Sequence, residues 1–244
     1  MDLMSDLVNK EPTCFEEATK KKDWVDAMIK EYQSIIKNDV YEIVARPKDK
    51  SVVSSKWIFK MKHSADGSIE KYKAIFVACR FSQKEGIDYE ETFALVARYT
   101  SSRTILGLAS NMKWKLHQMD IKTTFLNGLI EEVYIEQPQG FETGDQETHV
   151  CKLKKALYGL KQAPRAWYGR IDAFLMSLEF TKSKANSNLY YKVEGDELMI
   201  LLLYVDDLFI IGEEKIINEC KKKLTAEFEM KELGMMHYFL GLEV

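Results

Sequence analysis

This chain has few cysteines and few prolines, and neither sign of charge predominates. Its 244 residues include four cysteines and four prolines, and the formal net charge is −3. The near-neutral charge argues against a global basic field, so any nucleic acid must be bound by local basic clusters. The cysteines form no Cys-x-x-Cys pair, which argues against a zinc site or a disulfide framework and favours a reducing intracellular setting. They are Cys14, Cys79, Cys151 and Cys220.

Long apolar segments are also missing. The N-terminal residues have no basic region followed by an apolar one, so we expect a protein that is not secreted. The longest apolar run, residues 198–211, has fourteen residues and carries charge at its middle, which is too short and too polar to span a bilayer. A composition of 46% hydrophobic and 11% aromatic residues is typical of a globular protein. The length suits one large domain or two closely associated subdomains.

Hydrophobic periodicity predicts a mixture of helices and strands. Helical spacing predicts helices over residues 11–38, 100–111, 164–178 and 213–228. Short apolar or alternating runs predict strands over residues 41–44, 52–62, 71–81, 114–125, 133–138, 190–193, 198–211 and 236–244. Asp66-Gly67 lies between two of these runs and predicts a β-hairpin. The mixed order indicates a compact α+β fold.

Two local basic clusters are candidates for phosphate binding. The first lies on the predicted hairpin, where lysines are interleaved with aromatic residues: Lys56, Lys60, Lys62, Lys71 and Lys73 with Trp57, Phe59 and Tyr72. The second lies between residues 152 and 165 and consists of Lys152, Lys154, Lys155, Lys161 and Arg165. Cations that alternate with aromatic rings can bind single-stranded nucleic acid. A run of charge is more often a solvated face, and composition alone leaves both interpretations open.

Two adjacent carboxylates, Asp206 and Asp207, interrupt the longest apolar run. Ionised carboxylates in an apolar setting are costly unless they are paired, hydrogen-bonded or bound to metal. Two strands that meet at a Val-Asp-Asp turn would hold both acids at an edge that solvent can reach. A plain surface turn is the simpler interpretation, because Asp is common in turns. Asp120, in another predicted strand, also needs a partner, and a compact sheet can bring the three acids together.

Three neighbouring carboxylates would repel one another, and hard divalent cations relieve that repulsion. Oxygen ligands without His or Cys favour magnesium or manganese. Two such ions close together are a known arrangement for the in-line transfer of a nucleotidyl or phosphoryl group. The acids therefore suggest a two-metal transferase as the alternative to a surface turn.

Four segments, in this order, resemble the copia-type (Pseudoviridae) retrotransposon reverse transcriptases: Gln118–Gly128, Leu157–Trp167, Tyr204–Asp207 and Phe239–Glu243. The resemblance extends over residues 11–244. It implies a fingers-and-palm polymerase fold in which the palm is an antiparallel sheet backed by helices. It places the fingers mostly in residues 40–100 and the palm mostly in residues 101–244, and we expect no thumb or ribonuclease H region in the chain.

The resemblance also implies a role for each matching residue. The metal-binding catalytic acids would be Asp120, Asp206 and Asp207, holding two Mg²⁺ (or Mn²⁺) ions. Substrate would contact Lys73, Tyr158, Gln162 and Phe125, of which Phe125 would exclude a 2′-hydroxyl. Nucleic acid would contact Tyr204, Lys161, Arg165, Phe239, Leu240 and Gly241.

The implied activity is RNA-directed DNA polymerisation, in which dNTPs are added to a primer 3′-hydroxyl. The implied partners are an RNA or DNA template with its primer, dNTPs and the other domains of a polyprotein, with no membrane. The implied location is a cytoplasmic particle, the nucleus or both.

Several positions depart from the family pattern. Ile75 and Cys79 stand where the family has basic residues, Arg80 replaces a glycine, and Leu95 replaces a proline. Loss of a charge-assisted contact to triphosphate would cost roughly 1.5–3 kcal/mol. A side chain where glycine's φ freedom was needed would add strain of about 1 kcal/mol or more. Two alternatives therefore stay open: a remnant that only binds nucleic acid, and an unstable fragment without a biochemical role.

Overall fold

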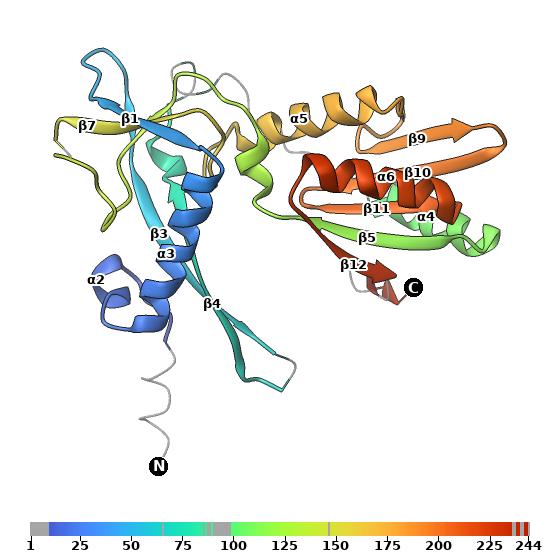
Figure 1. The fold of residues 1–244 in the computed structure, drawn as a ribbon, viewed down its shortest axis with the longest axis horizontal. Coiled ribbons are helices and arrows are strands. Elements are labelled where there is room, and N and C mark those ends of the chain that lie inside the picture. The colour runs from blue at the N-terminus through green and yellow to red at the C-terminus, as the bar shows by residue number, and fades with distance from the viewer. Residues whose placement is uncertain are drawn as a thin grey trace. The chain divides into compact units, whose positions relative to one another are not determined.

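The computed structural model describes residues 10–64, 66–84, 86, 89, 99–145, 147–235, 238, 239, 242 and 243. The chain divides into two compact units (Figure 1). The first unit comprises Met1–Thr92 and Leu129–Ala163, and the second comprises Phe93–Gly128 and Pro164–Val244. Both units combine helices with sheet, so the predicted α+β class is confirmed. In the described part of the chain, no helix has the length and apolar character needed to cross a membrane.

The first unit contains two helices, a small sheet and a long hairpin. The helices are α2 (Phe15–Ala18) and α3 (Lys22–Lys37), and a short 3-10 turn, η1, covers Arg80–Ser82. The sheet has the order β1-β7-β6-β2, with β1 at Tyr41–Ala45, β7 at His149–Leu153, β6 at Tyr134–Ile135 and β2 at Val52–Val53. The hairpin pairs β3 (Ser55–His63) with β4 (Ile69–Ala78).

The single helix expected over residues 11–38 is wrong, because α2 ends before α3 begins. The Thr19 hydroxyl donates a hydrogen bond to the Glu16 carbonyl at 3.0 Å, and Lys21 has an extended backbone with φ −123° and ψ 124°. Such local side-chain bonds compete with the continuation of a helix. Helical spacing in the sequence predicts an apolar face that includes Trp24 and Ile36; in α3 Trp24 is buried as expected, whereas Ile36 is 51% exposed.

The predicted β3–β4 hairpin is confirmed, with Gly67 at φ +84° in its turn. Lys60 pairs with Lys73 across the hairpin, and Lys62 pairs with Lys71, so four of the lysines lie on one face. Burial lowers the pKa of Lys71, and the neighbouring lysine charges lower it further.

The aromatic residues of the hairpin lie on its other face. Trp57 and Phe59 are buried, and the Trp24 ring of α3 lies 5.5 Å from the Phe59 ring and 4.8 Å from the Tyr72 ring. The idea that these rings and the lysines form one surface for nucleic acid is therefore wrong. Successive side chains of a strand point to opposite faces, so a sequence that alternates lysines with aromatic residues puts the lysines on one face and the aromatic residues on the other.

The second unit is built on an antiparallel sheet with the strand order β12-β5-β11-β10-β9-β8. Its strands are β5 (Lys115–Ile121), β8 (Thr181–Lys182), β9 (Leu189–Glu194), β10 (Glu197–Tyr204), β11 (Asp207–Gly212) and β12 (Met230–Met235). Its helices are α4 (Tyr99–Met112), α5 (Ala163–Ser177) and α6 (Glu214–Glu227), with a 3-10 turn η2 at Thr124–Asn127. Two short strands, β13 (Tyr238–Phe239) and β14 (Leu242–Glu243), form a separate hairpin.

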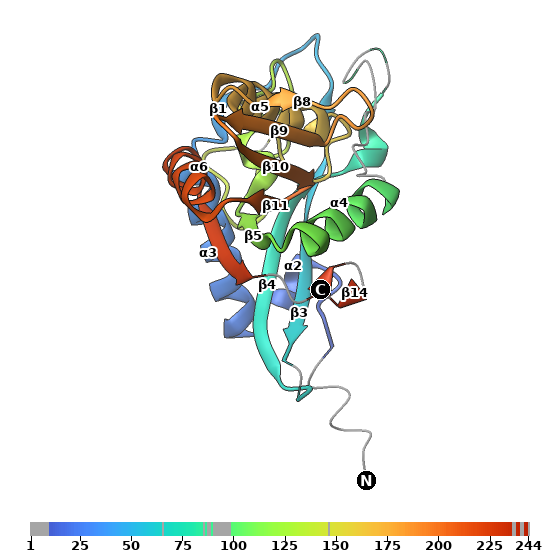
Figure 2. The same ribbon diagram turned by 90° about the vertical axis from the view of Figure 1, so that its right-hand side faces the viewer.

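The sheet of the second unit is covered on both faces (Figure 2). On one face Met119 and Ile121 of β5 pack in a core with residues of α5 and α6. On the other face Leu116 of β5 packs with Ile105 and Ala109 of α4. Because side chains alternate along a strand, the even-numbered residues of β5 lie on the α4 face.

Two strand predictions for this unit need correction. The strand expected over residues 114–125 ends at Ile121, because Thr123 takes a left-handed conformation with φ 50° and the Thr124 hydroxyl donates to the Ile121 carbonyl at 2.7 Å. In place of the single strand expected over residues 236–244, the described residues of this segment form two short strands, β13 and β14, that pair antiparallel with each other. The prediction that residues 198–211 are two strands joined at a turn is confirmed by β10 and β11.

The expectation of backbone strain at Arg80 is also wrong. Arg80 lies in η1 and does not have a positive φ, so the absence of glycine needs no unusual conformation there. Leu95 lies outside the described residues.

Candidate active site

Two of the three candidate acids of the second unit, Asp120 and Asp207, lie in one row across its sheet. Asp207 at the start of β11 is paired with Tyr204 of β10 on one side and with Asp120 of β5 on the other. Directly opposed residues in antiparallel strands have their side chains on the same face, with Cβ atoms about 5 Å apart. The next strand continues the row, because Lys231 of β12 is paired with Asp120. The row lies on the α4 face of the sheet.

The turn between β10 and β11 carries the third acid. Asp206 is exposed, and its carbonyl accepts a hydrogen bond from the Ile121 amide at 2.8 Å. Val205 has φ 55°, which is rare for a β-branched residue and costs on the order of 1–3 kcal/mol. The indole Nε1 of Trp167 in α5 donates to the Val205 carbonyl at 2.8 Å. Hydrogen bonds from β5 and α5 thus hold the turn in this conformation.

The environment of Asp207 disfavours its charge. Burial raises its pKa above the ordinary value, and the charges of Asp206 and Asp120 raise it further. A hydrogen bond of 2.9 Å from the Gln118 amide to Asp207 Oδ1 acts in the opposite direction. The ionised form of Asp207 is therefore disfavoured unless a positive charge is added beside it.

The chemistry of the donors fits a hard divalent cation. The row offers carboxylate oxygens, the ligands that Mg²⁺ and Mn²⁺ prefer. The charges of Asp206 and Asp120 both help to raise the pKa of Asp207, so a cation beside Asp207 would relieve that repulsion. Within the residues that the structure describes, however, no three His, Cys, Asp or Glu side chains gather closely enough to hold a metal ion as they stand. The backbone thus brings the acids to one edge without closing them around a common point.

The other predicted site residues fall into both units. In the second unit, Phe125 of η2 packs against the core beneath α5, and Tyr204 packs against the core beneath α4. Arg165 is exposed in the first turn of α5. Phe239 lies in β13, where only its backbone is described, and Leu240 and Gly241 lie outside the described residues.

The remaining predicted contacts belong to the first unit. Lys73 lies on the lysine face of β4, and Tyr158 is half-buried. Gln162 accepts a hydrogen bond from the Gln83 amide at 2.9 Å. Lys161 Nζ lies 2.6 Å from the Tyr89 hydroxyl and 4.2 Å from the centre of its ring. The structure thus places the acids in one unit and these residues in the other.

Comparison with known proteins decides the family. A family model described as reverse transcriptase (RNA-dependent DNA polymerase) matches residues 38–244. The chain belongs to the reverse transcriptase family.

Its relatives confirm the predicted copia-type retrotransposon branch. It is 42% identical over 248 residues to the retrovirus-related Pol polyprotein from transposon TNT 1-94 of Nicotiana tabacum, covering 99% of this chain and 18% of that protein. It is 39% identical over 236 residues to the Pol polyprotein from transposon RE1 of Arabidopsis thaliana, covering 96% and 16%. With the transposon Ty1-BR Gag-Pol polyprotein of Saccharomyces cerevisiae it shares 27% over 244 residues, covering 92% and 13%. The reverse transcriptase chain thus spans less than a fifth of these polyproteins.

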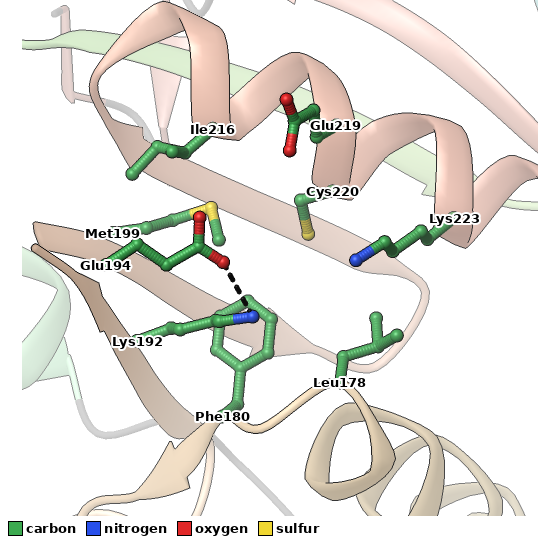
Figure 3. Close-up of a pocket in the computed structure, with 9 residues that line it drawn as sticks. All are labelled: Leu178, Phe180, Lys192, Glu194, Met199, Ile216, Glu219, Cys220 and Lys223. Carbon is green, nitrogen blue, oxygen red and sulfur yellow. Dashed lines mark ion pairs between the residues drawn. The ribbon is translucent and has the colours of Figure 1, made fainter. Parts of the chain in front are cut away.

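One pocket of the reverse transcriptase chain is lined by none of the predicted site residues (Figure 3). It is lined by Cys220 of α6 and by Lys192 of β9, which is paired with Glu194 at 2.7 Å. Burial raises the pKa of Cys220 to about 12, so its thiol stays protonated and unreactive near neutral pH. The Cys220 thiol is therefore a poor nucleophile in this pocket.

Sequence reasoning gave no role to several residues that support the site. Gln118 and Trp167 lie in the quoted motifs, but only the structure shows their bonds to Asp207 and Val205.

Lys221 of α6 is 7% exposed, contacts His117 Nδ1 at 2.8 Å and forms an ion pair with Glu232. It thereby ties α6 to β5 and β12. The helical spacing of the buried residues Ile217, Lys221 and Leu224 was a signal that could have found it.

Replacing Trp167 by Phe should weaken the support of the acidic turn. The variant keeps an aromatic ring in the core but removes the donor to the Val205 carbonyl, at a cost of about 1 kcal/mol. We expect a small drop in melting temperature and a loss in nucleotide incorporation that is larger than the drop in stability alone explains. Steady-state kinetics and thermal unfolding of both proteins measure this. Trp57→Phe, which removes a bond of 3.0 Å to the Gln139 carbonyl in the other unit, is the control. Equal losses of incorporation in both variants would contradict a role of Trp167 in the turn.

Proposed function

We propose that this chain catalyses RNA-directed DNA synthesis by transferring the nucleotidyl group of a dNTP to a primer 3′-hydroxyl. The observation that supports this most directly is the register that sets Asp207 opposite Asp120, with Asp206 in the adjoining turn, in a chain of the reverse transcriptase family. Asp120, Asp206 and Asp207 would hold two Mg²⁺ or Mn²⁺ ions. Bound ions would lower the pKa of the primer hydroxyl and compensate the charge of the leaving pyrophosphate.

The protein's own groups would supply orientation. The Gln118 amide holds one oxygen of Asp207, and Trp167 and Ile121 hold the turn that presents Asp206. Such fixed placement lowers the reorganisation needed to reach the transition state. Phe125 would lie below the deoxyribose and exclude a 2′-hydroxyl by steric clash.

In this proposal residues 40–100 supply most of the fingers and residues 101–244 most of the palm. Lys73, Tyr158 and Gln162 would contact the incoming nucleotide, while Lys161, Arg165, Tyr204 and residues 239–241 would contact template and primer. The relatives are Pol polyproteins, so other domains of such a polyprotein are the proposed partners. The proposed location is intracellular.

One observation favours a second candidate, a nucleic-acid-binding remnant with little polymerase activity. Ile75 pairs with Ile58 on the face of the hairpin that carries the lysines, so its side chain replaces a cation within the charged face. The remaining lysines still offer phosphate contacts. This candidate predicts salt-dependent binding of primer–template with no incorporation.

Primer extension on a poly(rA)/oligo(dT) template tests the proposal. We expect incorporation of dTTP with Mg²⁺ or Mn²⁺, none with EDTA, and none in the double variant Asp206→Asn, Asp207→Asn. Filter binding of the same primer–template across a salt series runs in parallel. A folded wild-type protein that binds primer–template but does not incorporate dTTP with either metal would refute the polymerase and favour the remnant.

A further inference from the structure

The loop that starts at Tyr158 carries several of the proposed contacts and is held by the segment that follows β4. The Ala78 amide, at the end of β4, donates to the Tyr158 carbonyl at 2.8 Å. Gln83, which follows η1 and is only 5% exposed, accepts a hydrogen bond from the Lys161 amide at 2.8 Å on its side-chain oxygen. Its side-chain NH2 group donates to Gln162 Oε1 at 2.9 Å. One buried side chain of the first unit therefore joins two neighbouring residues of this loop.

The hydrogen bonds around Gln83 allow its side-chain amide only one orientation. A backbone N–H can only donate, so the Lys161 amide requires the Gln83 oxygen on its side. The other end of the Gln83 amide is then an NH2 group, which also can only donate and requires the Gln162 oxygen. Turning either side-chain amide round would set two donors against each other, which is unfavourable in a buried place. The backbone of the loop thus fixes the orientation of the Gln162 amide through Gln83.

We propose that Gln83 is a positioning residue that turns the NH2 group of Gln162, and not its oxygen, toward the incoming nucleotide. The triphosphate of a dNTP presents acceptor oxygens, so an NH2 group attracts it, whereas an amide oxygen in the same place would repel it. The inference rests on the proposed function, in which Gln162 contacts the nucleotide. It adds that the binding of the nucleotide depends on a buried residue that does not touch it.

Gln83→Glu tests the inference because a carboxylate keeps the acceptor and loses the donor. One carboxylate oxygen can still accept from the Lys161 amide. The other requires a donor, so the Gln162 amide should turn round and leave its oxygen toward the nucleotide. We expect the KM for dTTP in primer extension to rise about tenfold, the value of one hydrogen bond to a charged group, with kcat within about twofold of wild type. An unchanged KM would overturn the inference.

Gln137 offers a matched control in the same unit. It is also 5% exposed, its side-chain oxygen accepts from the Thr143 amide at 2.8 Å, and its NH2 group donates to the His149 carbonyl at 3.1 Å. A backbone carbonyl cannot turn round, so Gln137→Glu sets two acceptors against each other. This variant should lose more melting temperature than Gln83→Glu and leave the KM for dTTP unchanged. A KM that follows the melting temperature in both variants would show a merely structural role and overturn the inference.

A primer that ends in a dideoxynucleotide separates this inference from the polymerase itself. Such a primer cannot be extended, so equilibrium dialysis with labelled dTTP measures the Kd of the ternary complex without incorporation. A wild-type protein that binds dTTP but does not extend an ordinary primer refutes the polymerase. The Kd of Gln83→Glu, expected to be about tenfold weaker, then still decides about Gln83. A wild-type protein that does not bind dTTP overturns the inference.

A double variant shows whether Gln83 acts through Gln162. Gln162→Leu removes the amide, so adding Gln83→Glu to it should not weaken the affinity for dTTP further. A further loss would mean that Gln83 acts on the loop as a whole, and would overturn the inference. If Gln83→Glu does not fold, Gln83→Met replaces it, because it keeps the approximate shape and removes both hydrogen bonds. The Kd for dTTP should again rise, and an unchanged Kd would overturn the inference.

Discussion

Replacing Asp207 by Asn should abolish nucleotide incorporation and at the same time stabilise the metal-free protein. Loss of a carboxylate that holds the ions should lower kcat on the order of a thousandfold or more. The gain in stability arises because burial and two neighbouring acids disfavour the ionised form of Asp207. An amide can still accept the hydrogen bond from Gln118, so the neutral variant keeps that contact. We expect a gain on the order of 1 kcal/mol, roughly 2–4 °C in melting temperature in EDTA.

The sign of the pH dependence follows from the raised pKa of Asp207. A group whose pKa is higher in the folded than in the unfolded state binds protons more readily when folded, so it stabilises the fold at low pH. This contribution is lost as the pH rises from the ordinary value of 3.8 through the raised value in the folded protein. The stability advantage of Asp207→Asn should therefore appear across that window and persist at neutral pH. Unfolding with a denaturant at several pH values measures it.

Magnesium should reverse the order of stability. At ten times the dissociation constant, a bound ion stabilises the wild type by about 1.4 kcal/mol, whereas a variant that lacks the carboxylate gains less. A metal-free Asp207→Asn protein that is less stable than wild type would contradict the electrostatic account.

Asp66→Asn is the control, because Asp66 lies in an exposed hairpin turn where the hydrogen bonds from Ser68 lower its pKa. That variant should lose stability and retain activity.

Replacing Gly159 by Ala should strongly destabilise the first unit. Gly159 has φ +92°, and a Cβ built there would lie 2.0 Å from the Ala78 carbonyl oxygen. The loop cannot retreat freely, because the Ala78 amide donates to the Tyr158 carbonyl at 2.8 Å. The positive φ and the steric clash together should cost about 3 kcal/mol, roughly 6–12 °C in melting temperature. Calorimetry of the two proteins measures the difference.

Gly67→Ala is a matched control in the same unit. Gly67 also has a positive φ, +84°, but a Cβ there would meet no atom within 4 Å. It should therefore show only the conformational cost of about 1 kcal/mol. Similar losses in both variants would mean that the contact with Ala78 does not matter. Because Tyr158 and Gln162 flank Gly159 in the loop, Gly159→Ala should also weaken dTTP binding, whereas Gly67→Ala should not.

Local sequence patterns predicted most of the secondary structure. The apolar run around Asp206 and Asp207 was predicted to be two strands and a turn, because two charges in its middle need access to solvent. Helical spacing located α4, α5 and α6 to within two residues of their ends. The strand that carries Asp120 was extended too far, because the left-handed turn at Thr123 has no signal in its apolar pattern. Local chemistry thus determined which elements form, and the motifs indicated the family.

Only the tertiary structure decided which residues meet. The alternation of a strand separates its two faces, but it does not reveal the neighbouring strand or the register between them. The pairing of Asp207 with Asp120, the addition of Lys231 to their row and the bond from Trp167 to Val205 join residues far apart in the chain. The separation of the hairpin lysines from their aromatic neighbours appeared only when α3 packed on one face.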